Sequence, residues 1–206
     1  MRSLLGGAAC LAASAVLLAA NGRPARQTAG GDRAAIILDN PFVRVFRAAG
    51  SGLTGVDHEP GVVVPIDKPE MTRWTSDAAL PGAAPPGPLV IVEPKPYATK
   101  PPPLARAEKP GEGQSTGMSF KTMFENATVA VLRARMEVGA TESFHTHASD
   151  TIVVYLTSGA IANTVEGKTR TDRWKKGDAE FEARGSSHSA KNAGQAIDVV
   201  LVTLKR

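Results

Sequence analysis

Hydrophobic and polar residues alternate with a period of two along most of the second half of the chain, as in half-buried β-strands. The alternating or apolar segments that we predict as strands are residues 120–124, 128–138, 144–147, 151–157, 161–165, 169–175, 180–183 and 197–205. Turns are expected between them at Glu166-Gly167-Lys168 and at Gly177-Asp178. Because no segment has a helical period, these short strands predict an all-β sandwich or barrel.

A segment of the first half resembles one of these strands. Residues 38–48 align without a gap with residues 124–134, and in both an Asn turn leads into an alternating strand that ends in Arg-Ala. Downstream of each segment, a His precedes three consecutive β-branched residues, at 62–64 and at 152–154. We interpret residues 33–80 as a degenerate copy of the second-half unit. A chance likeness between two short strands is the alternative.

Proline divides the two halves. Ten of the 15 prolines lie between Pro81 and Pro110, and none follows Pro110. Proline has no N–H group for a sheet ladder, so residues 81–115 are predicted to form a linker or surface loop and not a central strand. One short strand, residues 90–92, is expected inside it.

The first 20 residues have the pattern of an export signal. Arg2 precedes an apolar, Ala-rich run over residues 4–20, and small residues end the run at Ala19 and Ala20. We therefore predict a signal peptide over residues 1–20 and an exported protein, periplasmic or secreted, without a stable membrane span after cleavage. A retained anchor is the alternative.

Composition narrows the chemistry of the mature chain. Cys10 is the single cysteine and lies inside the predicted signal, and lipidation there is disfavoured because Gly7 stands where an aliphatic residue is usual. If the predicted signal is cleaved, the mature chain has no cysteine. It then has no disulfide, no thiolate nucleophile and no cysteine-ligated metal. The net charge is +4, but Lys and Arg are spread along the chain without a nucleic-acid-binding motif, so no nucleic-acid partner is expected.

Two of the four histidines, His145 and His147, are separated by one residue on a predicted strand. Side chains two positions apart on a strand share a face, with Cα atoms about 6.5 Å apart, so both imidazoles can turn to one metal ion. His188 follows a Gly185-Ser-Ser turn at the end of another strand and is the candidate third ligand. His58 stands alone in the first half and is interpreted as a solvated loop residue.

The spacing of these residues resembles the two motifs of the cupin superfamily. Gly139, five residues, His145-Thr-His147 and then Gly159 resemble the first motif. The second is matched by Gly177, five residues, Ala183-Arg-Gly185, two residues, His188, three residues and Asn192. The resemblance implies a cupin-type jelly-roll β-barrel over residues 116–206. It also implies a divalent transition metal (Fe, Mn, Ni, Cu or Zn) at His145, His147 and His188, a small-molecule substrate, and pairing of barrels into a homodimer.

The chain departs from the cupin pattern at two places. Ala183 stands where the second motif has proline, which is a mild change. The first motif has a glutamate ligand at a position occupied here by Thr151 or Ile152, and neither side chain can replace it. Asp150, one position earlier, either substitutes for this ligand or caps a turn. A three-His site without the carboxylate leaves the ion with one more net positive charge, which favours anionic substrates.

Two classes of function are compatible with these residues. One is a metal-dependent oxygenase or related enzyme that acts on a small oxygen-rich compound. The other is a non-catalytic module that binds a small ligand or a metal, or a structural relic. Side chains that could line the mouth of the barrel or orient a ligand are Tyr155, Asn163, Arg184 and Gln195. Trp74 and Trp174 are expected to pack in the core, and Asn192 to stabilise a turn.

Overall fold

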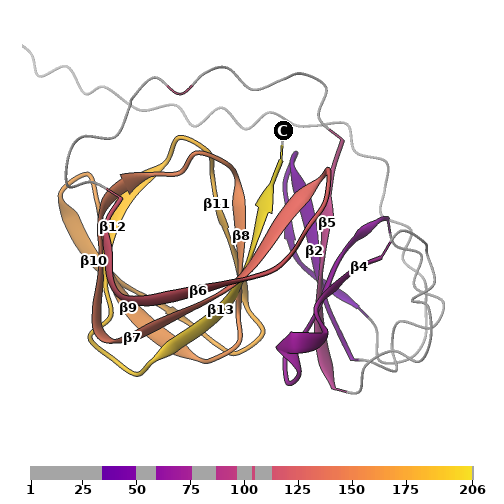
Figure 1. The fold of residues 1–206 in the computed structure, drawn as a ribbon, viewed down its shortest axis with the longest axis horizontal. Coiled ribbons are helices and arrows are strands. Elements are labelled where there is room, and N and C mark those ends of the chain that lie inside the picture. Colours follow the sequence, from indigo (N-terminus) through magenta and orange to yellow (C-terminus); the bar gives the residue numbers. More distant parts are fainter. Residues whose placement is uncertain (1–33, 50–58, 76–86, 97–103, 105–112, 206) are drawn as a thin grey trace, which may run out of the picture. The chain divides into compact units, whose positions relative to one another are not determined.

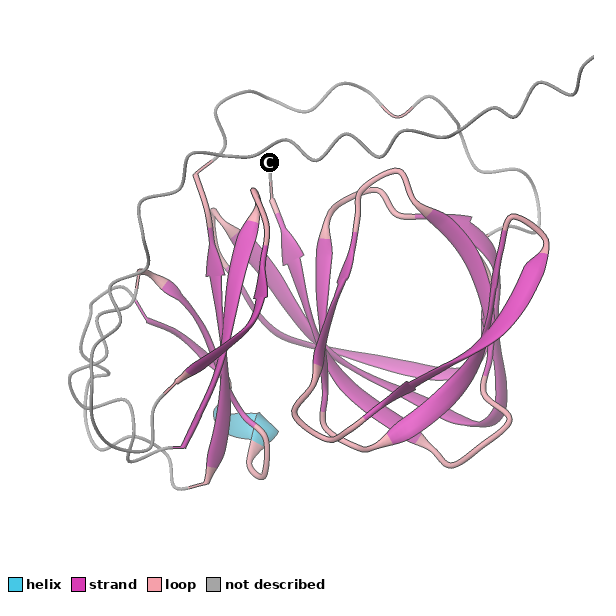
Figure 2. Cartoon of the chain, turned by 180° about the vertical axis from the view of Figure 1, so that it is seen from behind, coloured by secondary structure: helices cyan, strands magenta, loops and turns pink. Residues whose placement is uncertain are grey.

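The computed structural model describes residues 34–49, 59–75, 87–96, 104 and 113–205. These residues are nearly all in strands, with a single short 3-10 helix, η2 (Pro69–Met71), among them (Figure 2). The predicted signal, Cys10 and His58 lie outside this part of the chain, so the expectations about them stay predictions. The described residues contain no helix of the length and apolarity needed to cross a membrane.

The second half forms a curled antiparallel sheet of eight strands, in which Figure 1 shows the strands winding around a common axis. The strands are β6 (Ser115–Glu125), β7 (Val129–Thr146), β8 (Thr151–Tyr155), β9 (Gly159–Val165), β10 (Lys168–Trp174), β11 (Ala179–Glu182), β12 (Ser187–Lys191) and β13 (Ile197–Leu204). The order is β10-β9-β12-β7-β13-β8-β11, with β6 on β7. The order contains two four-stranded sheets, β10-β9-β12-β7 and β7-β13-β8-β11, which share β7. This is the arrangement of a jelly roll. The predicted jelly-roll β-barrel is confirmed.

The long strand β7 connects the two sheets of the barrel. Its first part pairs with β13 up to Met136, and its last part pairs with β12 from Thr141 onward. Between them Gly139 has a φ of +80°, which glycine adopts with little steric strain. The strand can therefore change direction here without ending. The sequence predicted two strands here because this glycine interrupts the alternation. Asn192 holds the bend as expected: it is fully buried, and its amide donates to the carbonyl of Met136.

Strands β8 and β13 are buried on both faces, which explains their nearly continuous apolar sequences. Ile152, Val154 and Val200 point to one core, while Val153 and Val199 point to the other, in the period of two expected of strands. The second of these cores is the barrel interior. The first core extends beyond the barrel.

The first half forms a separate antiparallel sheet of five strands, in the order β1-β2-β5-β3-β4. The strands are β1 (Ala35–Asp39), β2 (Val43–Ala49), β3 (Gly61–Pro65), β4 (Arg73–Thr75) and β5 (Pro88–Pro94). The expectation that the Pro-rich stretch holds no central strand is wrong for β5, which pairs with both β2 and β3. Its prolines stand at its two ends, so the N–H groups of residues 89–93 stay available for the ladder.

This five-stranded sheet repeats the barrel sheet β6-β7-β13-β8-β11 strand for strand. Leu38 pairs with Val45 as Phe124 pairs with Val131, and the bulge before Leu38 recurs before Phe124. The pairing of β3 with β5 likewise matches that of β8 with β13. These equivalences support the hypothesis of a degenerate copy, whose domain bounds stay a prediction. The copy lacks counterparts of β9 and β10, because only residues 66–72 connect β3 to β4.

The two equivalent sheets contribute to one hydrophobic core. Its buried members from the first half, which match buried members of the barrel at equivalent positions, are Val43, Val45, Val62, Val64, Ile66, Val90 and Val92. The barrel contributes Val129, Val131, Ile152, Val154, Leu156, Val200, Val202 and Leu204. Aromatic stacking of Phe42 on Phe181, with ring centroids 6.0 Å apart, lies beside this core. The face of β7, β8 and β13 outside the barrel is therefore covered by the chain itself.

Candidate metal centre

The three histidines singled out by the sequence come together inside the barrel. His145 on β7 and His188 on β12 are direct partners in the antiparallel ladder, so the fold places them side by side. Nε2 of His188 lies 3.2 Å from Nε2 of His145 and 3.2 Å from Nε2 of His147. Three nitrogens that each lie about 2.1 Å from one ion at tetrahedral angles would be about 3.4 Å apart. The two measured spacings are close to this value, and the ligand atoms of all three histidines lie within 4.8 Å of one another, so the cluster could share one ion.

The opposite nitrogen lies within hydrogen-bond distance of an oxygen in two of the imidazoles and close to a carboxyl group in the third. Nδ1 of His188 lies 3.1 Å from Oδ1 of Asn163, and Nδ1 of His145 lies 3.1 Å from the carbonyl of Ser143. Nδ1 of His147 lies 3.7 Å from Oε2 of Glu182. Acceptors at Nδ1 favour the tautomer with the proton there, which leaves the Nε2 lone pairs directed at one point. This donor set fits a divalent transition metal.

Burial keeps these imidazoles in the form that binds metal. Burial, together with the neighbouring His188 and His145, lowers the pKa of His147 to about 4. Burial likewise lowers the pKa of His188 to about 4, with His145 as the second cause. Both rings are therefore neutral at pH 7, which is the ligand form of histidine.

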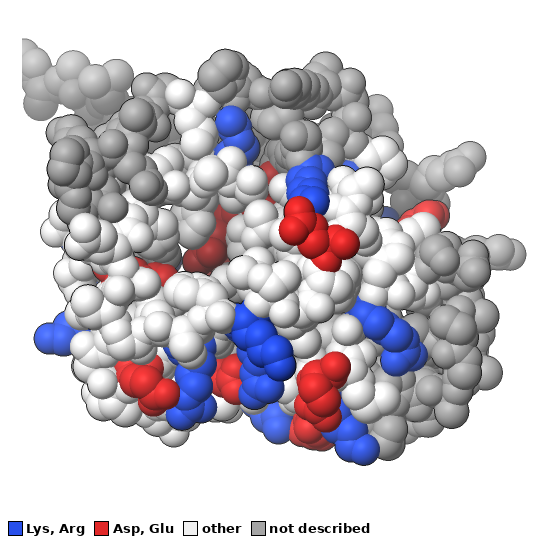
Figure 3. Space-filling model, viewed as in Figure 1, with Lys and Arg blue, Asp and Glu red and all other residues white. Residues whose placement is uncertain are grey.

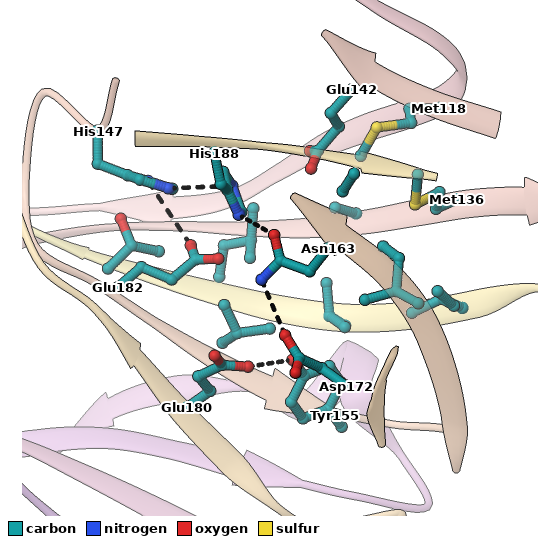
Figure 4. A pocket seen from close by; sticks show the side chains of 18 of the residues that line it. Met118, Met136, Glu142, His147, Tyr155, Asn163, Asp172, Glu180, Glu182 and His188 are labelled. Atoms are coloured by element: carbon teal, nitrogen blue, oxygen red, sulfur yellow. Dashed lines mark hydrogen bonds and ion pairs between the residues drawn. The ribbon is translucent and has the colours of Figure 1, made fainter. Parts of the chain in front are cut away.

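The histidines stand at the wall of a cavity of about 270 Å³ in the barrel (Figure 4). Apolar side chains form part of its lining, namely Met118, Met136, Val153, Ile161 and Leu201. Tyr155 stacks on Trp174 at the cavity wall, with ring centroids 4.2 Å apart and 16° between the planes. A cavity that combines apolar side chains with convergent polar groups is typical of a small-molecule site.

Four carboxylates line the same cavity: Glu142, Asp172, Glu180 and Glu182. Burial raises the pKa of Glu182 to about 8, and the charges of Glu180 and Glu142 act in the same direction. Burial also raises the pKa of Glu142. Glu180 accepts a hydrogen bond of 2.7 Å from the Tyr155 hydroxyl, and Asp172 accepts one of 2.8 Å from the Asn163 amide. The wall therefore carries four acidic side chains, of which Glu182 is mainly protonated at pH 7.

The missing glutamate of the first motif has a neighbour in space. Thr151, one of the two residues at that motif position, lines the cavity, whereas Ile152 points into the core shared with the first half. Glu182 on β11 is the ladder partner of Thr151 and also faces the cavity. A carboxylate thus stands one strand away from where the motif would place it.

The other sequence candidates divide into two groups. Tyr155 and Asn163 line the cavity as expected, and Trp174, expected to pack, lines it as well. Asp150 lies outside the lining and accepts a hydrogen bond of 2.6 Å from the Arg184 backbone N–H, which joins the segment before β8 to the turn before β12. Arg184 and Gln195 are also absent from the lining. Their side chains donate to the carbonyls of residues 148 and 158, respectively.

The acidic residues of the cavity lining were not predicted from the sequence. Glu180 and Glu182 are two positions apart on one strand, which was a usable signal that they share a face. Glu142 gave no such signal, because it is three positions from His145 and alternation would place them on opposite faces. The β12–β7 ladder has a register shift between the partners of His145 and of Glu142, and this bulge returns Glu142 to the cavity face.

No protein-family model and no curated protein matches the chain. Solved structures resemble less than half of it. They include a cupin domain from Bordetella pertussis Tohama I, with 22% identity, 44% of this chain and 95% of that chain covered, and a TM-score of 0.41. KdgF from Halomonas sp. is 23% identical, and the match covers 44% of this chain and 80% of that chain with a TM-score of 0.37. A predicted oxalate decarboxylase from Thermotoga maritima is 20% identical, and the match covers 46% of this chain and 87% of that chain with a TM-score of 0.38.

Proposed function

We propose that the barrel holds one divalent transition-metal ion through Nε2 of His145, His147 and His188 and acts on a small molecule bound in the adjoining cavity. The observation that carries this proposal is the convergence of three imidazoles through Nε2, with an oxygen near each Nδ1. Neutral, buried imidazoles in this arrangement would be left with poorly satisfied polar atoms if no ligand joined them. Fe, Mn, Ni, Cu and Zn all accept such a donor set.

Enzymatic use of the ion is favoured over storage. Three protein ligands leave coordination positions open, and a bound ion of this kind supplies Lewis-acid or oxygen-activating chemistry. The cavity beside the histidines gives a substrate access to those positions. Asn163 orients His188 and is itself held by Asp172, so the histidine geometry has a supporting layer. We propose a metal-dependent oxygenase or related enzyme, with a non-catalytic metal-binding module as the second candidate.

The setting of this activity is also a proposal. The signal pattern of residues 1–20 supports export to the periplasm or the medium. On the face in Figure 3, Lys and Arg are interspersed with Asp and Glu, which favours a small-molecule partner over a nucleic acid. Because the first-half sheet shares a core with the barrel face of β7, β8 and β13, a homodimer would have to form through other strands.

Elemental analysis by mass spectrometry of the chain, purified without a His tag, tests the metal centre. We expect about one transition-metal ion per chain, its loss in His188→Ala, and its retention in His58→Ala, which removes the histidine outside the motifs. Far-UV circular dichroism checks that both variants fold. Absence of metal after reconstitution with Fe(II), Mn, Ni and Zn would contradict the proposal. Metal without turnover in a substrate screen would favour the non-catalytic candidate.

A further inference from the structure

The charge of the cavity restricts what it can bind. Glu142, Asp172, Glu180 and Glu182 reach it from three strands, β7, β10 and β11. No Lys or Arg belongs to the lining among the described residues. In Figure 3, acidic side chains are visible inside a hollow of the face shown. Recognition of a carboxylate or phosphate in proteins uses Arg, Lys or backbone N–H groups, and this lining offers acidic side chains instead.

The acidic groups lie at two places in the cavity. Glu182 lies beside His147, with its Oε2 3.7 Å from Nδ1 of the ring. Glu180 and Asp172 lie together near Tyr155, away from the labelled histidines in Figure 4. Asp172 has a partner in Arg170, whose Nε lies 2.8 Å away, whereas the Tyr155 hydroxyl that donates to Glu180 is neutral. Glu180 therefore presents the negative charge that a metal ion at the histidines would offset least.

The aromatic pair beside Glu180 complements a cation as well. Tyr155 donates to Glu180 and stacks on Trp174, so a carboxylate and two aromatic rings lie at one wall of the cavity. Aromatic faces attract cations, and the exposed Glu180 carboxylate beside them adds a Coulomb attraction for a positive charge. The apolar wall formed by Met118, Met136, Ile161 and Leu201 suits an uncharged carbon skeleton.

We infer that this cavity takes a small organic cation, an ammonium group on an apolar body, and that the ammonium group is bound at Glu180 beside Tyr155 and Trp174. This inference rests on the proposed function for the location of the site and deepens it by naming the ligand class. It replaces the expectation from the sequence that a three-His centre favours anionic substrates. The charge gained by losing the motif glutamate is offset by acidic neighbours on other strands.

Isothermal titration calorimetry at pH 7 tests the inference with three probes that share a phenyl ring and differ in charge. The probes are benzylammonium, benzyl alcohol and benzoate. We expect benzylammonium to bind about tenfold more tightly than benzoate. In Glu180→Gln the affinity for benzylammonium should fall about fivefold, while that for benzyl alcohol stays unchanged. Glu137→Gln is the matched control, because Glu137 is exposed, pairs with Arg135 and lies outside the lining.

Titration of both metal-loaded and metal-free chain separates this inference from the metal proposal. A cation preference in chain that binds no metal would leave the ligand class standing while the metal centre fails. Metal-loaded chain that binds benzoate as tightly as benzylammonium, or none of the probes at millimolar concentration, would overturn the ligand class alone. An equal loss in Glu137→Gln and Glu180→Gln would also overturn it, because the effect would then arise from net charge and not from the cavity.

Discussion

The five-stranded sheet of the first half and its equivalent in the barrel share strand order and register, yet among the residues that the structure describes only the barrel has a candidate site. Along β8, Thr151, Val153 and Tyr155 face the cavity. The equivalent residues of β3, from the matched ladders, are Gly61, Val63 and Pro65. All three are buried, and Val63 belongs to an apolar cluster with Leu89 and Ile91. The same backbone pattern thus carries a polar cavity wall in one copy and an apolar core in the other.

The difference lies in the second sheet of the jelly roll. Strands β9, β10 and β12 supply Asn163, Asp172 and His188, and the first half has no counterpart of β9 or β10 between β3 and β4. Even the strand that both copies retain has changed chemistry, because Glu180 and Glu182 on β11 correspond to Arg73 and Thr75 on β4. The face that forms the shared core has stayed apolar in both copies. The residues that pack the shared core and those that line the candidate site therefore lie at different positions of this fold.

The largest effect should come from breaking the shared core. Ile152→Ala is expected to lower the free energy of unfolding by about 3–4 kcal/mol, and the equivalent Val62→Ala by about 2 kcal/mol, because a smaller side chain is removed. Trp74 reports on the first half and Trp174 on the barrel, so Trp174→Phe and Trp74→Phe backgrounds follow each part by fluorescence in urea. Both reporters should give one transition. Two separate midpoints would show that the halves do not unfold as one core.

A loss of metal affinity is expected from a change on a strand that the first half lacks. Asn163→Ala removes the acceptor at Nδ1 of His188 and should weaken metal binding about 10–100-fold, as losses of such supporting hydrogen bonds do. Competition with a chelating indicator measures this affinity. Thr164→Ala on the same strand is the control, because Thr164 bonds to Thr169 at an exposed position. Equal weakening by both variants would contradict an orienting role for Asn163.

An arginine at equivalent positions in the two copies should matter more in the barrel. Arg133 bonds through two nitrogens to the nearly buried Asp198, at 3.0 Å and 2.5 Å. Its counterpart Arg47 bonds to Asp178, where both side chains are more than one-third exposed. Arg133→Met leaves a buried carboxylate without this partner and should cost about 2 kcal/mol of unfolding free energy, against less than about 1 kcal/mol for Arg47→Met. Urea unfolding of the two variants checks the ranking, and a reversed order would contradict it.

Most of the barrel and the histidine cluster could be predicted from the sequence, because alternation and motif spacing are local properties. The strands over residues 151–157 and 197–205 were found from their apolar runs. Strand β12 was missed, because its sequence, Ser187–Lys191, is short and polar, and its strand conformation depends on pairing with β7 and β9. Long-range pairing of this kind leaves no periodic signal in five residues.

The residues that line the cavity could not be predicted from the sequence for a related reason. Asp172 reads as one polar residue of an exposed strand, and only the curl of the sheet turns it toward His188 through Asn163. The strand expected at residues 90–92 is present in β5, but its central place in a sheet was excluded because proline density was averaged over the whole stretch, although residues 89–93 contain none. Composition over a window was therefore misleading about the position of this strand in the sheet.

The smallest effect concerns the turn that first suggested the repeat, and it should be the same in both copies. Oδ1 of Asn40 accepts from the N–H groups of Phe42 and Val43 at 2.8 and 2.9 Å, and Oδ1 of Asn126 accepts from those of Thr128 and Val129 at the same distances. Asn40→Ala and Asn126→Ala should each cost about 1 kcal/mol of unfolding free energy, whereas Asn→Asp at either position keeps the acceptor and the turn. Urea unfolding measures all four variants. Since one core joins the two sheets, each Ala variant should shift the same single transition by a similar amount, and an effect at Asn126 without one at Asn40 would mean that the first copy no longer depends on its turn.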